Sequence, residues 1–321
     1  MINQLVKRNS NLPKTSPHKS KGWAITKAIK TLALMFGAML LLSGCSDVIS
    51  MHPKGVIASE QKELFIISVL LMLIVVIPVI ILTVVFAYRY RASNKKATYK
   101  PKWAHNTLLE IIWWTIPCII IVILAVITWI TTHSLDPYKP LITKDNKKPI
   151  VIEVVSLDWK WLFVYPEEGI ATVNHIEFPT NRQISFKITA DSPMTSFIIP
   201  QLGGQIYAMA GMQTQLHLLA NVPGKYYGFN ANYSGEGFAG MNFIATATNE
   251  KQYKQWIDQV KASKNHLTMN TYEQLRKPSK DVPVTYYSTV VPKLYHHIVM
   301  SYMMPPEDMI EKNLKKDEAK F

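Results

Sequence analysis

The stretch Asn232–Phe243 has the composition of a binding loop. It contains Gly235, Gly237 and Gly240, and it lies between two segments with strand-like patterns. Glycines let a backbone approach a metal or a ligand closely, and such loops often carry function. The stretch holds neither Cys nor His, however, so it has few side chains that could bind a metal. Its glycine content therefore suggests a binding loop, whereas its side chains do not.

Other catalytic or metal-binding patterns are missing from the sequence. There is no Gly-x-Ser-x-Gly, no phosphate-binding P-loop and no His-Glu-x-x-His. The histidines of the polar region are scattered, and we interpret each as a satisfied core or surface residue rather than a ligand. They are His175, His217, His266, His296 and His297.

The chain has only two cysteines, Cys45 and Cys118, and neither lies in the polar C-terminal two-thirds. This excludes a disulfide framework and any thiolate metal site in that region. Cys118 falls within an apolar run, where a free Cys behaves as a small hydrophobic residue. The net charge is +13, but residues 1–44 supply seven Lys or Arg and no acid. No basic face interleaved with aromatic residues remains, so we expect no nucleic-acid partner.

The N-terminal residues 1–44 predict an export signal of the lipoprotein class. A basic segment precedes the apolar run Thr31–Leu42, and Leu42-Ser43-Gly44-Cys45 looks like a lipobox. Cleavage would leave Cys45 as a lipidated N-terminus, followed by a periplasmic segment over 45–63. The alternative is a first membrane helix with a chance Cys, which the short apolar run disfavours.

Two apolar runs predict a transmembrane hairpin over residues 64–135. Leu64–Tyr88 and Ile111–Leu135 are each 25 residues long without a Lys, Arg, Asp or Glu, and about 20 residues cross a bilayer. We place the spans at 64–88 and 108–135. Between them, Arg89–Lys102 carries six Lys or Arg and no acid, which favours a cytoplasmic loop. Both outer ends would then face the periplasm of a bacterial inner membrane.

Residues 150–248 have the pattern of an all-β domain. Short Val-, Ile- and Thr-rich runs alternate with Pro and Gly, which predicts about seven strands in a sandwich or barrel. The predicted C-terminal region, 249–304, is helical. A helix over Asn249–Ser263 would bury one apolar face, and a second helix would run from Pro292 to Met304. Residues 305–321 form a charged tail.

Three motifs give this arrangement a family resemblance. Asp158-Trp159-Lys160-Trp161, Ser196–Gly203 and Gln205–Met212 resemble the aromatic segment and the following turn of subunit II of the haem–copper respiratory oxidases. The resemblance extends from Cys45 to about residue 304. It implies a two-helix transmembrane hairpin followed by a cupredoxin-like β-sandwich with C-terminal helices.

The copper ligands of this family do not carry over to the chain. In cytochrome c oxidases the domain binds two coppers through a His, a Cys-x-Glu-x-Cys-x3-His-x2-Met motif and a Glu backbone carbonyl. Only Glu236 matches, and it matches the ligand that binds through its backbone. The side-chain ligand positions hold Thr195, Ser234, Phe238, Asn242 and Ala245. We therefore expect no metal or other cofactor in this chain.

A subunit II without the copper ligands resembles the quinol-oxidising branch of the family. Within that branch the chain most closely resembles subunit II of cytochrome o (bo-type) ubiquinol oxidase. The resemblance implies a complex that oxidises ubiquinol, reduces O2 to water and pumps protons. Haems and the remaining copper would lie in subunit I, with subunits III and IV as further partners, and cytochrome c would not be the donor. Trp159, where relatives admit electrons, would serve in packing.

Glu110 is the one carboxylate at the start of the second span. The segment from His105 to Pro117 resembles the family segment whose Glu lies near a proton pathway into subunit I, so Glu110 is a candidate for proton uptake. Alternatively, Glu110 lies among headgroups beside Lys102 and His105 as a solvated ion pair.

Two other functions remain to be weighed. A copper-bearing cytochrome c oxidase subunit would need Cys at positions 234 and 238, which hold Ser and Phe. A free-standing membrane-anchored binding lipoprotein or copper chaperone would use exposed methionines, although packed or solvated Met is the more common case. Its candidates are Met209, Met212, Met303 and Met304.

Overall fold

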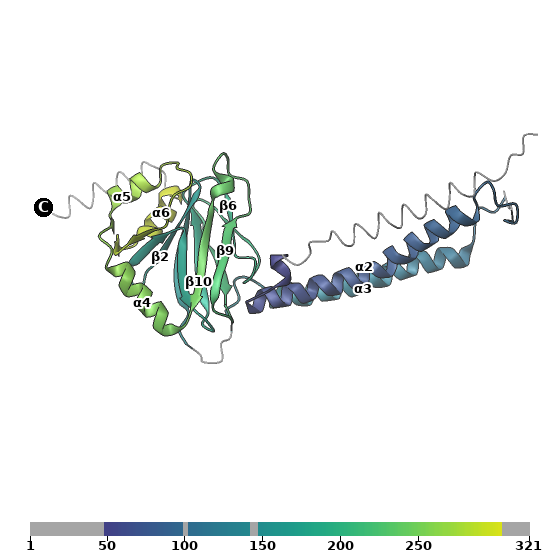
Figure 1. Ribbon diagram of the computed structural model, residues 1–321, viewed down its shortest axis with the longest axis horizontal. Coiled ribbons are helices and arrows are strands. Elements are labelled where there is room, and N and C mark those ends of the chain that lie inside the picture. Colours follow the sequence, from purple (N-terminus) through teal and green to yellow (C-terminus); the bar gives the residue numbers. More distant parts are fainter. Residues whose placement is uncertain (1–47, 99–101, 142–146, 304–321) are drawn as a thin grey trace, which may run out of the picture. The chain divides into compact units, whose positions relative to one another are not determined.

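The structure is a computed structural model, and it describes residues 48–98, 102–141 and 147–303. The predicted signal segment with Cys45 and the predicted charged tail lie outside these residues. A short 3-10 helix, η2 (Ile49–Met51), precedes two long helices, α2 (Val56–Arg89) and α3 (Thr107–Ser134). Both are long and apolar enough to cross a membrane. Figure 1 shows them side by side as a hairpin.

The helices begin and end for local reasons. The Asn106 side chain accepts a hydrogen bond from the Leu109 amide (3.1 Å) and so caps the N-terminus of α3. Pro78 and Pro117 lie inside α2 and α3. Helix α2 starts eight residues before the predicted span, because Val56–Glu63 continues the helix with mixed polarity. Its first turn is fixed by hydrogen bonds from the Lys54 and Ala58 amides to the carbonyls of Gln201 and Leu202.

The polar region is a sandwich of two sheets, which confirms the predicted cupredoxin-like all-β class. The first sheet has the order β12-β3-β2-β1-β5-β8, and the second has the order β4-β10-β9-β6-β7. The strands are β1 (Ile150–Leu157), β2 (Lys160–Tyr165), β3 (Ile170–Val173), β4 (His175–Pro179), β5 (Ile184–Ala190), β6 (Thr195–Ile198), β7 (Ile206–Ala208), β8 (Thr214–Leu218), β9 (Gly224–Asn230), β10 (Asn242–Thr248) and β12 (Thr285–Tyr287).

An aromatic cluster fills the space between the sheets. Phe197 stacks on Phe243 at 5.1 Å between ring centroids, and the edge of Trp161 meets Phe197 at 5.4 Å. All three side chains are buried. Burial of aromatic rings of this size contributes strongly to the stability of the sandwich. The cluster joins β2 of one sheet to β6 and β10 of the other.

The C-terminal region combines helices and strands. Helix α4 (Glu250–Lys261) buries Tyr253, Trp256, Ile257 and Val260, as its periodicity predicts. Further elements are α5 (Met269–Leu275), α6 (Leu294–Met303), and β11 (His266–Leu267) paired with β13 (Thr289–Val290). In Figure 1 these elements lie on the side of the sandwich where β2 is labelled.

Two sequence-based expectations about these elements need correction. The prediction of about seven strands is too low, since β1–β10 all lie within 150–248. The missed strands are short, such as β7 with three residues, and their burial does not alternate. The region 249–304 is not purely helical, because β12 pairs with β3 and completes the first sheet.

Candidate site at the glycine-rich loop

The glycine-rich loop joins two neighbouring strands of the second sheet. Strands β9 and β10 are antiparallel, and the loop between them contains a 3-10 turn, η3 (Phe238–Gly240). The Asn230 amide donates to the Met241 carbonyl (3.1 Å) and closes the base of the loop. A loop held at both ends by paired strands is a stable platform for a site.

The loop encloses Trp159. The indole Nε1 donates to the Ser234 carbonyl (2.9 Å). A Cβ at Gly237 would lie 2.3 Å from Cγ of Trp159, and one at Gly235 would lie 3.5 Å from its ring. No side chain fits at position 237 unless the ring moves. Gly235 also has φ +101°, a conformation that favours glycine. Gly235 and Gly237 therefore make room for the indole of Trp159, a side chain of the same protein.

A segment from the C-terminal region, which includes Lys280 and Asp281, completes the surroundings of Trp159. The Lys280 ammonium lies 5.8 Å from the centroid of the indole ring and forms an ion pair with Glu236 (2.6 Å). This pairing lowers the pKa of the Glu236 carboxyl through the hydrogen bond and charge of Lys280. The Asp281 carboxylate fills the space that a Cβ of Gly240 would need, at 2.6 Å. Glu236, retained from the copper motif, is an exposed partner of Lys280.

Lys160, in the interior of the protein, holds the same C-terminal segment through hydrogen bonds. Its side chain is fully buried, and Nζ donates to the Lys277 carbonyl (2.8 Å), the Ser279 hydroxyl (2.7 Å) and the Asp158 carbonyl (3.1 Å). Burial lowers the pKa of this ammonium, and the charge of Asp158 partly offsets that effect. Three acceptors compensate the cost of burying a charge.

Asn230 is the polar centre of the site. Its carboxamide oxygen accepts from the amides of Ser196 (2.9 Å) and Asn232 (3.0 Å). Its Nδ2 donates to the Ser234 hydroxyl (3.0 Å) and to the sulfur of Met241 (3.4 Å). The side chain is almost completely buried. One carboxamide thus links β6, the loop and Met241, which directly precedes β10.

The positions that the sequence analysis matched to copper ligands have separate surroundings. The Thr195 hydroxyl, on β6, donates to the Ser156 hydroxyl of β1 (2.7 Å). Asn242 is half-buried in the ladder opposite Phe229, and the Ala245 methyl is buried in the core. The structure links Ser234 to the neighbourhood of Thr195 through Asn230, whereas Ala245 lies opposite Tyr226 in the strand ladder.

Phe238 lines a shallow groove on the outside of the loop. Its ring packs against Tyr233 at 5.6 Å between centroids. The groove has a volume of about 380 Å3, and its other lining residues include Tyr227, Phe229 and Met241. The Phe238 ring offers packing surface and no metal donor.

The residues present do not fit a copper centre. Among the described residues, no group of three or more His, Cys, Asp or Glu is placed to hold a metal ion. The candidate donors are hydroxyls and a carboxamide that already bond to one another, whereas such copper centres require thiolate and imidazole. The described residues around the loop thus offer no donor set for such a centre, and the absence of a metal from this chain stays a prediction.

Sequence reasoning missed Asn230 and Ser156, which hold the site together. Ser156 lies within an apolar run, and only its place opposite Thr195 reveals its role. Asn230 precedes the loop and does not occur in the ligand pattern. A buried Asn at a strand end, next to several turn-forming residues, is the signal that could have indicated such a hydrogen-bonded centre.

The remaining candidate residues lie elsewhere. The Glu110 carboxylate, in the first turn of α3, lies 2.7 Å from Nδ1 of His105, and both side chains are exposed. The Thr107 hydroxyl lies 3.1 Å from Nε2 of the same ring. Cys118 is a free, exposed cysteine on α3. Cys45 lies outside the described residues.

The histidines of the sandwich have hydrogen-bond partners, in agreement with the sequence analysis. His175 bonds to Thr246 (3.2 Å) and Tyr286 (3.3 Å), and His217 bonds to Gln183 (2.8 Å). Burial lowers the pKa of His175 to about 4, with a further contribution from the positive charge of Lys225. His175 is therefore neutral near pH 7.

A buried carboxylate, Asp191, joins the sandwich to the C-terminal helices. Asp191 accepts hydrogen bonds from the hydroxyls of Tyr272 on α5 and Tyr302 on α6 (2.5 Å for Tyr302). Arg276 donates to the same carboxylate (2.9 Å). Burial, followed by the hydrogen bond to Asp191, raises the pKa of Tyr302 to about 12. These four side chains, which we call the Asp191 clasp, form one charged hydrogen-bonded cluster. It connects the loop after β5 to the C-terminal region.

Three family models match parts of this chain. Residues 53–129 match the family "Cytochrome C oxidase subunit II, transmembrane domain", and 168–248 match its periplasmic domain. Residues 261–306 match the "COX Aromatic Rich Motif", which includes α5 and α6.

Similar full-length proteins agree with these matches. The cytochrome bo(3) ubiquinol oxidase subunit 2 of Pseudomonas aeruginosa is 54% identical and covers 86% of this chain and 82% of its own length. The ubiquinol oxidase subunit 2 of Acetobacter aceti is 52% identical, covering 82% and 85%. The quinol oxidase subunit 2 of Bacillus subtilis is 39% identical, covering 87% and 86%. The chain thus belongs to the subunit II family of the respiratory oxidases, in the branch of the bo-type quinol oxidases.

Proposed function

We propose that this chain is subunit II of a proton-pumping terminal oxidase that oxidises ubiquinol and reduces O2 to water. The observation that carries the proposal is the site at the glycine-rich loop. Its polar groups bond to one another and its glycines enclose Trp159, so the domain offers no relay for electrons from cytochrome c. Relatives with ubiquinol oxidase names at 52% identity and above support the choice of donor.

The role of the chain within the complex is structural. Its two helices would pack against subunit I, which would hold the haems and the remaining copper, and subunits III and IV would complete the assembly. The sandwich would cover the complex on the periplasmic side of the bacterial inner membrane. The six cations and no acid of Arg89–Lys102 support a cytoplasmic loop between α2 and α3. Lipidation of Cys45 would add a further anchor.

The intact complex provides the test of this function. The chain is purified from its membrane through an affinity tag, and ubiquinol and reduced cytochrome c are compared as donors. We expect a haem-bearing complex that oxidises only ubiquinol. Recovery of the chain alone, without haem, would instead favour a free-standing binding lipoprotein. A copper absorption band in the purified chain would favour the copper-binding alternative.

Glu110 is proposed as a residue of proton uptake at the cytoplasmic end of α3. The resemblance of the segment from His105 to Pro117 to the family's proton-pathway segment supports this proposal, whereas the exposed pairing of Glu110 with His105 (2.7 Å) fits the alternative of a solvated pair. Glu110→Gln should lower both turnover and the number of protons pumped, while Glu110→Asp should retain most of each. Unchanged pumping in Glu110→Gln would leave Glu110 as a charge that stabilises the N-terminus of α3.

A further inference from the structure

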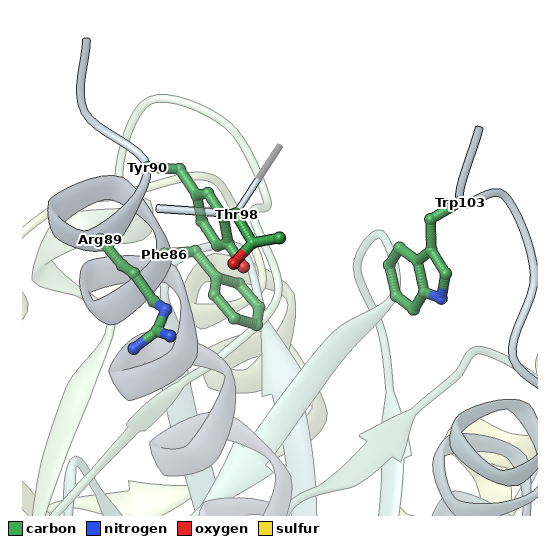
Figure 2. Close-up of a pocket in the computed structure, with 5 residues that line it drawn as sticks. All are labelled: Phe86, Arg89, Tyr90, Thr98 and Trp103. Carbon is green, nitrogen blue, oxygen red and sulfur yellow. The ribbon is translucent and has the colours of Figure 1, made fainter. Parts of the chain in front are cut away.

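A pocket lies at the end of α2, away from the glycine-rich loop. Its volume is about 680 Å3, and it is lined by Phe86, Arg89, Tyr90, Thr98 and Trp103. Figure 2 shows Phe86, Tyr90 and Thr98 gathered near the last turn of α2, with Trp103 apart from them. The rings of Phe86 and Tyr90 lie 6.2 Å apart. The pocket thus combines apolar walls with one cation.

The charge of this pocket is not compensated by the protein. Within the described part of the chain, no carboxylate forms an ion pair with Arg89. The Arg89 carbonyl accepts from the Asn94 side chain (2.6 Å), which satisfies the helix end and leaves the guanidinium available. The described residues from Arg89 to Lys102 include five Lys or Arg and no acid. A ligand with negative charge would supply what the pocket lacks.

The remaining polar groups of the lining also favour an anion. Tyr90 and Thr98 offer hydroxyl donors, while Trp103 lies apart from them with its indole nitrogen turned away (Figure 2). The guanidinium fork of an arginine suits the two free oxygens of a phosphodiester. Phe86 and the ring of Tyr90 provide apolar contact beside that charge.

The pocket lies where a lipid headgroup would be found. Arg89 is the last residue of α2, so it marks the boundary between the apolar span and water. Tyr and Trp side chains concentrate at this boundary in membrane proteins. Basic pockets at the ends of membrane helices bind anionic headgroups. A soluble anion would not need the apolar wall that Phe86 provides.

We propose that this pocket binds the headgroup of an anionic phospholipid. Its phosphate would contact Arg89, and its glycerol and upper acyl chain would lie against Phe86 and Tyr90. The inference requires only that α2 and α3 span the membrane, and it is independent of the electron donor of the complex.

The experiment measures lipid retention by the intact oxidase complex. The complex is reconstituted in nanodiscs that contain phosphatidylglycerol and phosphatidylcholine, released, and examined by native mass spectrometry. We expect wild type to retain phosphatidylglycerol preferentially, and Arg89→Gln to retain about tenfold less, equivalent to about 1.4 kcal/mol. Tyr90→Phe, which removes only a hydroxyl, should lower retention about two- to threefold.

Arg91→Gln is the matched control. It removes the same charge two residues away, where the guanidinium lies over the Tyr88 ring at 4.1 Å and outside the pocket. We expect less than a twofold effect. Equal losses in both arginine variants would reduce the inference to diffuse charge attraction and overturn it. Absence of preferential retention in wild type, or displacement of the lipid by inorganic phosphate, would also overturn it.

Discussion

Trp159 shows how one residue can account for the composition of a distant loop. Gly235, Gly237 and Gly240 suggest a ligand in the sequence, and the structure identifies two of their neighbours as the Trp159 ring and the Asp281 carboxylate. Trp159 itself has φ +62°, an uncommon conformation for a large residue. Such strain persists only where the surroundings hold the residue firmly, here through the loop and Lys280.

Gly237→Ala should destabilise the sandwich by about 1 to 3 kcal/mol, because the new methyl would overlap the Trp159 ring. The measurement is thermal unfolding of the detergent-solubilised chain, followed by near-UV circular dichroism. In a Trp159→Gly background the same Ala substitution should cost much less. Additive losses in the double variant would mean that Gly237 is needed for a reason other than the ring.

His175 should make stability depend on pH. Its pKa is lowered to about 4, whereas an unfolded His titrates near its ordinary value of 6.5. The unfolded state therefore binds more protons between these values, and stability falls as the pH drops through this window. Allowing for partial exposure, the loss amounts to about 2 kcal/mol between pH 7.5 and pH 4.

The comparison with His175→Gln isolates this contribution. Glutamine retains hydrogen-bonding capacity toward Thr246 and Tyr286 but does not titrate in this range. Unfolding temperatures of both proteins are measured from pH 7.5 to pH 4. The advantage in unfolding temperature of the wild type over His175→Gln should shrink as the pH falls, because only the wild type carries the titrating His175. A difference that does not change with pH would contradict the assigned pKa.

At the scale of elements, the sequence predicts what periodicity and length can encode. Helix α4, both membrane helices and the longer strands follow from apolar patterns. The sheet order does not, because β1 pairs in parallel with β5, and β4 pairs in parallel with β10 across most of the domain. These registers depend on packing between distant segments. That residues 234–245 contain neither Cys nor His can be read from the sequence, whereas the Asn230 centre becomes visible only through contacts between distant segments.

The Asp191 clasp should decide how firmly α5 and α6 attach to the sandwich. Asp191→Ala removes the acceptor of three donors and should cost about 2 to 4 kcal/mol. Limited proteolysis of the solubilised complex should then cleave within residues 262–303 before the sandwich is lost.

Glu273→Ala is the control for Asp191→Ala. Glu273 is the second carboxylate on Arg276 (3.3 Å), and it is exposed. An exposed ion pair contributes about 0 to 1 kcal/mol, so the proteolysis pattern should remain that of wild type. If both variants loosened the region equally, Arg276 rather than the buried carboxylate would be the determinant.

At the scale of the whole molecule, the two helices and the predicted lipid on Cys45 are redundant anchors. Cys45→Ser should abolish incorporation of radiolabelled palmitate. The chain should nevertheless remain in the membrane after carbonate extraction, because α2 and α3 are each long enough to span it. Release of the variant into the soluble fraction would show that these helices do not anchor the protein by themselves.

The contacts around Trp159 have a consequence for the biogenesis of the protein. The side chains that hold the loop, which include Trp159, Asn230 and Lys280, all belong to the polypeptide itself. Residues 119–321 contain no thiol that must be kept reduced, and the hydrogen bonds that hold the loop need no metal ion. The sandwich should therefore reach its final form in copper-starved cells.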